Sequence, residues 1–125
     1  MAGYMLQLNF AISIPAEEYT RIVSDAAHHV ANVDGLRWKI WLVNEAQREA
    51  GGIYLFESRT AAEAYANGPI IANLRSAPFQ SGLTVKGFDF AEELTEVTRG
   101  PVGATVGSTA PLGTTVTERE VRLET

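Results

Sequence analysis

The spacing of apolar residues alternates between a strand period and a helix period along the first 91 residues, and this order limits the possible folds. Residues 4–12 alternate apolar and polar side chains, which is typical of a half-buried strand. Residues 15–33 repeat apolar side chains at helical spacing after Pro15 and two glutamates, and Gly35 follows, which can adopt a left-handed conformation. These patterns predict a strand and then a helix.

The next segments extend this pattern to a complete fold. Residues 36–44 and 52–57 predict two strands joined by a short charged loop, and residues 83–91 predict a fourth strand. Residues 60–77 predict a second helical stretch, with a break or kink at the Asn-Gly-Pro of 67–69. The order β-α-β-β-α-β predicts an α+β, ferredoxin-like fold, in which two helices cover one face of an antiparallel four-stranded sheet.

The composition changes near residue 98. The later residues are rich in Gly, Pro and Thr and show no period, so we predict a folded domain over 1–98 and a C-terminal arm or tail over 99–125. An arm that reaches a neighbouring subunit and a disordered tail are both compatible with this composition.

Charge and composition exclude several classes of function. The net charge of −5 disfavours binding to nucleic acid or to anionic membranes. The absence of cysteine excludes thiol catalysis and Cys-type metal sites. The chain has no apolar run of membrane-spanning length and its N-terminus lacks a signal-peptide pattern, so we expect a soluble cytoplasmic protein.

The strands predict two different sheet faces. We expect one face to pack against the helices, with Leu6, Leu8, Phe10, Leu36, Trp38, Ile40, Ile53 and Leu55. The other face would then carry Gln7, Asn9, Arg37, Lys39, Trp41, Val43, Tyr54, Phe56, Lys86, Phe88 and Phe90. In a monomer this face would be a large exposed hydrophobic patch, which favours association with another surface. We therefore expect a homodimer whose sheets close into a barrel around a cavity for a hydrophobic aromatic small molecule.

Other interpretations of the strand at 36–44 stay open. Arg37 and Lys39 are also compatible with solvated charges on an edge strand. Trp38 favours the core because it is in phase with its apolar neighbours, whereas Trp41 fits a cavity wall or a dimer contact equally well. A shift of one residue in register would exchange the two faces of this strand.

Three segments resemble the YdhR family of small proteins that are classed as monooxygenases. They are "LQLNFA" (6–11), "GLRWKIW" (35–41) and "EAGGIYLFES" (49–58), and the resemblance covers about residues 4–98. It implies a dimeric α+β barrel and the oxidation of an aromatic or polyketide-like phenol or enol without a cofactor. Members of the family often carry a histidine where this chain has Asn9. Because such barrels also host other activities, the fold alone does not fix the function.

The resemblance and the predicted cavity together suggest site residues. As catalytic residues we expect Asn9 and Lys39, which would stabilise an anion, and His29 as a proton acceptor. An alternative is that His29 is a helix residue with local or solvent bonds only. For substrate binding we expect Gln7, Arg37, Trp41, Tyr54, Phe56 and Phe88.

We expect no metal and no cofactor. The neighbouring His28 and His29 cannot share one helix face, and their surroundings are a weak set of ligands. The glycines at 51–52 lead into a strand rather than a helix, which favours a bulge or a close backbone approach over phosphate binding. Two alternative functions remain: a cyclase or isomerase that acts through an enolate, and a non-catalytic dimer that binds a small molecule.

Overall fold

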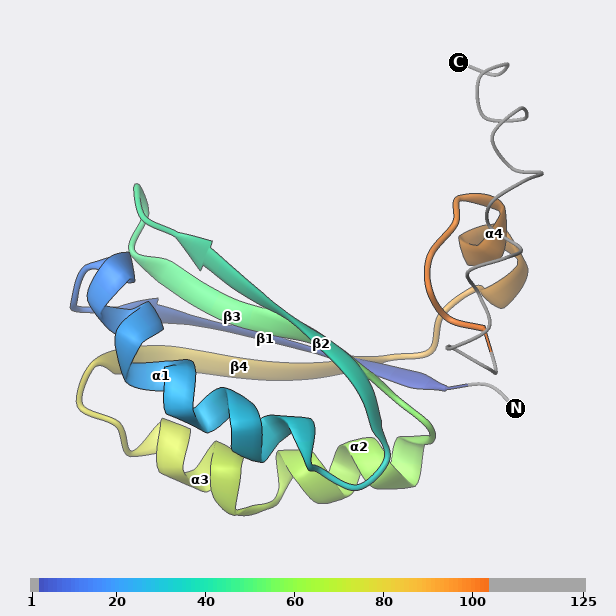
Figure 1. The fold of residues 1–125 in the computed structure, drawn as a ribbon, viewed down its shortest axis with the longest axis horizontal. Helices are drawn as coiled ribbons and strands as arrows, with labels where there is room; N and C mark the ends of the chain where they lie inside the picture. The colour runs from blue at the N-terminus through green and yellow to red at the C-terminus, as the bar shows by residue number, and fades with distance from the viewer. Residues whose placement is uncertain (1–2, 104–125) are drawn as a thin grey trace. The chain divides into compact units, whose positions relative to one another are not determined.

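The computed structural model describes residues 3–103, which form a four-stranded sheet and four helices (Figure 1). In chain order these are β1 (Tyr4–Ile12), α1 (Ala16–Ala31), β2 (Leu36–Asn44), β3 (Glu49–Phe56), α2 (Arg59–Ala66), α3 (Pro69–Arg75), β4 (Gln80–Phe88) and α4 (Glu92–Val97).

The sheet has the strand order β2-β3-β1-β4, and every neighbouring pair is antiparallel. Figure 1 shows α1, α2 and α3 together on one face of this sheet. The predicted ferredoxin-like α+β fold is therefore confirmed.

Local signals in the sequence explain where the helices begin and end. Pro15 precedes α1, whose first turn carries Glu17 and Glu18, and acidic side chains stabilise the positive end of a helix dipole. Gly35 follows α1 with φ 82°, the left-handed conformation that glycine tolerates best. The second helical stretch is broken as predicted, because α2 ends at Ala66 and α3 starts at Pro69.

The predicted face of β2 is wrong, because the strand contains a bulge. Leu36 pairs with Phe56 and Trp38 pairs with Leu55, so two steps along β2 match one step along β3 and Arg37 is the extra residue. Leu36 packs against the core as expected. Beyond the bulge the alternation is reversed. Lys39 and Trp41 therefore face the helices, while Trp38 and Ile40 take the opposite face.

The predicted face of β3 is also wrong. Tyr54 lies opposite Leu6 of β1 and Lys39 of β2, so the side chains of Tyr54 and Phe56 point towards the helices and those of Ile53 and Leu55 away from them. The prediction failed because residues 53–56 of β3 are apolar or aromatic on both faces and include no charged residue to set the phase. In β1, polar Gln7 and Asn9 do set the phase, and Leu6, Leu8 and Phe10 are buried as expected.

Residues 3–89 form one compact unit, and Phe90 begins a second. The second unit contains α4, a six-residue helix that the sequence pattern did not predict because it is too short to show a period. The helix ends at Val97; beyond it Arg99 has φ 69°, and Gly100 N donates to Thr95 O at 2.8 Å. Most of the predicted arm or tail over 99–125 lies outside the described residues, and the boundary at residue 98 stays a prediction.

Candidate functional site

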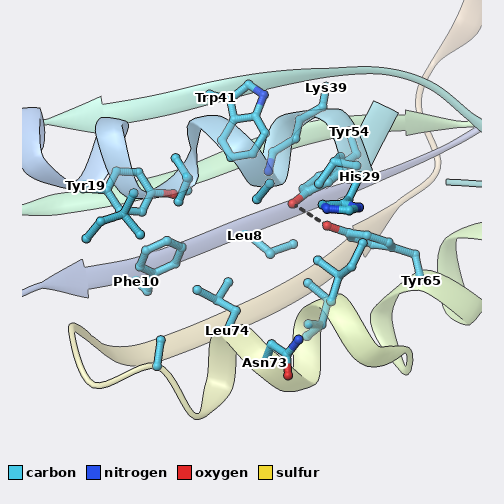
Figure 2. A pocket seen from close by; sticks show the side chains of 18 of the residues that line it. Leu8, Phe10, Tyr19, His29, Lys39, Trp41, Tyr54, Tyr65, Asn73 and Leu74 are labelled. Carbon is cyan, nitrogen blue, oxygen red and sulfur yellow. Dashed lines mark hydrogen bonds between the residues drawn. The ribbon is translucent and has the colours of Figure 1, made fainter. Parts of the chain in front are cut away.

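A cavity of about 650 Å³ lies between the helix-covered face of the sheet and the helices (Figure 2). Apolar and aromatic side chains make up most of its wall, and none of the described residues that line it is an Asp or Glu. The lining residues are Leu8, Phe10, Tyr19, Ile22, Val23, Ala26, His29, Val30, Lys39, Trp41, Gly51, Tyr54, Tyr65, Ile70, Ile71, Asn73, Leu74, Ala77 and Phe79. Such a wall with a few polar groups is typical of small-molecule sites.

Lys39 brings a cationic side chain into this apolar cavity. Its Nζ lies 3.2 Å from the centroid of the Trp41 ring and 4.6 Å from that of the Tyr54 ring. Gly52 makes this position possible, because a Cβ there would lie 2.7 Å from Lys39 Cε. The missing side chain of Gly52 leaves the space through which the lysine reaches the cavity.

Burial lowers the pKa of Lys39 from 10.5 to about 7. Removing the ammonium group from water disfavours its charged form, and the described lining of the cavity includes no carboxylate to compensate. The two ring faces favour the ammonium form and oppose this decrease. At neutral pH a large fraction of Lys39 is therefore a neutral amine, which can accept a proton.

Two buried tyrosines form a hydrogen-bonded pair in the cavity. The Tyr65 hydroxyl on α2 donates to the Tyr54 hydroxyl on β3 at 3.1 Å, which Figure 2 shows as a dashed line. Burial raises the pKa of both hydroxyls, so both stay protonated at neutral pH. Because Tyr54 accepts from Tyr65, its own proton is available for a ligand. Phe56 stacks on Tyr54 from within the core, with ring centroids 6.0 Å apart.

The remaining wall comes from the helices and the segment after α3. Tyr19 is buried between Phe10 and Phe79, with ring centroids 5.9 Å away on each side. Burial raises its pKa to about 12, with a smaller contribution from Tyr65. His29 on α1 and Asn73 on α3 are exposed residues that also line the cavity as polar groups (Figure 2).

The structure thus brings together only some of the predicted site residues. His29, Lys39, Trp41 and Tyr54 line the cavity, and Phe56 lies directly behind Tyr54. The other predicted residues, Gln7, Asn9, Arg37 and Phe88, are not part of its lining.

Those other residues lie mainly on the opposite sheet face. Asn9 and Gln7 line a separate hollow of about 250 Å³ with the ends of β2 and β3. Phe88 lies opposite Met5 on this face and is 42% exposed, and Arg37 occupies the bulge of β2. The residues that we expected to line one cavity therefore lie on two different faces of the sheet.

Three polar lining residues were missed from the sequence: Tyr19, Tyr65 and Asn73. Tyr19 and Tyr65 were indistinguishable from core positions because each lies in the apolar stripe of a helix. Their hydroxyl groups could have marked them as site residues, because a buried tyrosine usually needs a hydrogen-bond partner. Nothing in the sequence marks Asn73.

Within residues 3–103, no group of three or more His, Asp or Glu side chains is placed to hold a metal ion. In the same part of the chain, no helix combines the length and the apolar character needed to cross a membrane.

Fold and cavity together define a ferredoxin-like α+β protein with an aromatic, lysine-containing site between sheet and helices. The chain belongs to the family described as "Putative mono-oxygenase ydhR", whose model matches residues 5–101. A comparison with curated protein sequences found no match.

Solved structures with the same fold include two oxygenases and a haem-degrading protein. SnoaB, a cofactor-independent oxygenase from Streptomyces nogalater, superposes with a TM-score of 0.58 at 14% identity, covering 73% of this chain and 95% of its own. A monooxygenase from the ActVA-Orf6 gene of Streptomyces coelicolor, in complex with Nanaomycin D, has a TM-score of 0.56 at 16% identity, covering 72% and 88%. The haem-degrader MhuD from Mycobacterium tuberculosis has a TM-score of 0.52 at 26% identity, covering 70% and 95%.

Proposed function

We propose that this protein is a cofactor-independent monooxygenase that oxidises an aromatic or polyketide-like phenol or enol in the cavity around Lys39. The observation that carries the proposal is the position of Lys39 Nζ, which lies in an aromatic cavity whose described lining includes no carboxylate. The family and the two oxygenase structures that share the fold agree with this class of reaction.

Lys39 is the proton acceptor in this mechanism. Since its pKa is about 7, the neutral amine is present at physiological pH and takes the proton of the phenol or enol. The product is an ammonium group beside the substrate anion, an ion pair that is strengthened by the low dielectric of the cavity. The Tyr54 hydroxyl donates to the same oxygen, because Tyr65 already occupies one of its lone pairs.

The substrate anion then reduces dioxygen. One electron passes from the electron-rich carbon to oxygen, and the two radicals combine to form a carbon–oxygen bond. The resulting peroxide takes a proton and loses water to leave a carbonyl group. Overall the reacting carbon loses two hydrogens and gains one oxygen atom, while the second oxygen atom leaves as water.

The other residues of the cavity hold the substrate. Trp41 and Tyr54 supply ring faces for stacking a flat molecule, and Phe56 supports Tyr54 from behind. His29, which lines the cavity and is exposed, exchanges the proton of Lys39 with solvent.

We also propose a homodimer formed through the sheet face that the helices do not cover. Ile40 and Phe88 are exposed there by 50% and 42%, and a second copy would bury them. The roles expected for Gln7, Asn9, Arg37 and Phe88 stay predictions. They would require a binding surface completed by the partner subunit.

Oxygen uptake tests the proposed activity. The purified protein is incubated with anthrone- and naphthol-like phenols while dioxygen and product mass are followed together. Uptake with a gain of one oxygen atom in the product supports the monooxygenase. Conversion without uptake would instead identify the cyclase or isomerase, and binding without conversion would identify a binding protein. Haemin belongs in the same panel, because MhuD binds haem at its active site.

A further inference from the structure

The two lysines of the chain, Lys39 and Lys86, lie in contrasting surroundings. Lys39 projects from the edge strand β2 into the cavity, where it is the only lysine. Lys86 lies opposite Gln7 on the other face of the sheet and is exposed. One chain therefore offers a buried amine and a built-in comparison on the surface.

The surroundings of Lys39 suit a nucleophile as well as a base. Its Nζ faces the rings of Trp41 and Tyr54, and within residues 3–103 no ion pair holds it in the ammonium form. Burial lowers the pKa of this amine to about 7, and a neutral lysine in an apolar site is the form that attacks carbonyl carbons. Figure 2 shows the amine and the Tyr54 hydroxyl both directed into the cavity.

We propose that Lys39 forms a Schiff base with aromatic aldehydes or ketones that enter the cavity. The aromatic wall selects a flat apolar ring, and the amine then meets a carbonyl group attached to that ring. This activity goes beyond the proposed monooxygenase, because it needs neither dioxygen nor a phenol.

The step is balanced without an oxidant or a reductant. The Nζ lone pair forms a bond to the carbonyl carbon while the carbon–oxygen π bond breaks, and the oxygen accepts a proton from the Tyr54 hydroxyl. The nitrogen gives up its two protons, one returning to Tyr54 and one going to the leaving oxygen. That oxygen departs as water and leaves a carbon–nitrogen double bond.

The test traps this double bond in the full-length wild-type protein. Naphthaldehyde is added at pH 7 without oxygen, cyanoborohydride reduces any imine to a stable amine, and peptide mass mapping locates the added group. The N-terminal amine, whose ordinary pKa is about 7.7–8.0, serves as an internal standard for simple amine reactivity. Glyoxylate, a small polar aldehyde, tests whether the aromatic ring is needed.

The expected result has two parts. Lys39 is modified at least about tenfold faster than Lys86, because a neutral amine is abundant only where the pKa is near 7. Its modification also saturates with naphthaldehyde and is inhibited by methylnaphthalene, while modification of the N-terminal amine stays linear and uninhibited. Glyoxylate shows no preference of this kind.

Equal modification of the two lysines would overturn the proposal, as would modification of Lys39 that methylnaphthalene leaves unchanged. The wild-type experiment needs no substitution, so misfolding does not affect it. Lys39→Met and Lys86→Met then serve as matched variants, and only the first should lose the saturable modification. Because oxygen is absent throughout, failure of the monooxygenase assay has no bearing on the outcome.

Discussion

Lys39 crosses the neighbouring strand directly over Gly52. A Cβ at Gly52 would lie 2.7 Å from Lys39 Cε and 3.2 Å from the carbonyl oxygen of Ile40. The glycine therefore sets the path by which the lysine enters the cavity, and the chemistry proposed for Lys39 depends on a residue that has no functional group.

Gly52→Ala should displace Lys39 while the fold survives. The closest atom is the far end of a flexible side chain, so we expect a loss of about 1–3 kcal/mol in the free energy of unfolding. Gly51→Ala is the matched control, because its Cβ would overlap the backbone carbonyl of Leu8, which cannot move without separating β1 from β3. Urea denaturation measures both, and a Gly51→Ala variant as stable as Gly52→Ala would contradict this account.

Lys39 should make stability depend on pH between about 7 and 10.5. Its folded-state pKa is lowered to about 7 from 10.5, so in this window the unfolded chain binds more protons than the folded one. Folding is therefore penalised fully below pH 7, and the penalty disappears as the pH rises to 10.5. The free energy of unfolding of the wild type should rise relative to Lys39→Met by up to about 1.4 kcal/mol per pH unit. A constant difference between the two proteins across this range would refute the burial of an amine.

The hydroxyls of Tyr54 and Tyr65 should be energetically coupled. Tyr54→Phe leaves the buried Tyr65 donor without its acceptor, which costs about 1–3 kcal/mol, whereas Tyr65→Phe removes one hydrogen bond worth about 0.5–1.5 kcal/mol. The double variant should lose less stability than the sum, because both groups of the pair are then gone. Thermal or urea unfolding of all four proteins gives the coupling, and strictly additive losses would show that the hydrogen bond contributes nothing.

His29 and His28 form a matched pair for testing the proton path. Both are exposed on α1, but only His29 lines the cavity. His29→Gln should lower turnover several-fold and leave stability within about 0.5 kcal/mol, as is usual for surface substitutions. His28→Gln should leave both unchanged. Equal turnover in the two variants would support the alternative that His29 has local or solvent bonds only.

A charge on the outer sheet face should break the proposed homodimer. Ile40→Lys places an ammonium group where a second copy would bury an isoleucine that is 50% exposed in the single chain. Ile22→Lys is the control, because Ile22 is similarly exposed at 47% but lies on α1 across the sheet. Light scattering should give a dimer mass for the wild type and Ile22→Lys and a monomer mass for Ile40→Lys. A monomeric wild type at micromolar concentration would rule out the dimer.

The strand and helix order was predictable because β1 and the helices carry clear periods. In β1, Gln7 and Asn9 mark the outer face, and the Asn-Gly-Pro at 67–69 marks the break between α2 and α3. For Gly51 and Gly52 the sequence favoured a bulge or a close backbone approach, and the backbone carbonyl of Leu8 does lie close to Gly51.

The site was only partly predictable because its position depends on the phase of β2. A single extra residue at Arg37 reverses the alternation after Leu36, and a bulge of this kind leaves no mark in a strand that has large apolar side chains on both faces. The charge of Lys39 suggested the sheet face that the helices leave uncovered. Its side chain instead enters the cavity between sheet and helices, where burial lowers its pKa. The hydrogen bond between Tyr54 and Tyr65 joins β3 to α2, and no local pattern encodes it.

The most direct test of the account is the rate of oxygen uptake with an anthrone-like substrate, compared between wild type and Lys39→Met from pH 6 to pH 9. If Lys39 is the base, the wild-type rate rises with pH and levels off above about 7, where the amine is neutral. The variant should be slower by about 10²–10⁴-fold, as is typical when a general base is removed, and without this inflection. Isotope-labelled dioxygen should place one labelled atom in the product. Equal rates in the two proteins, or product that carries no labelled oxygen, would contradict the central claim.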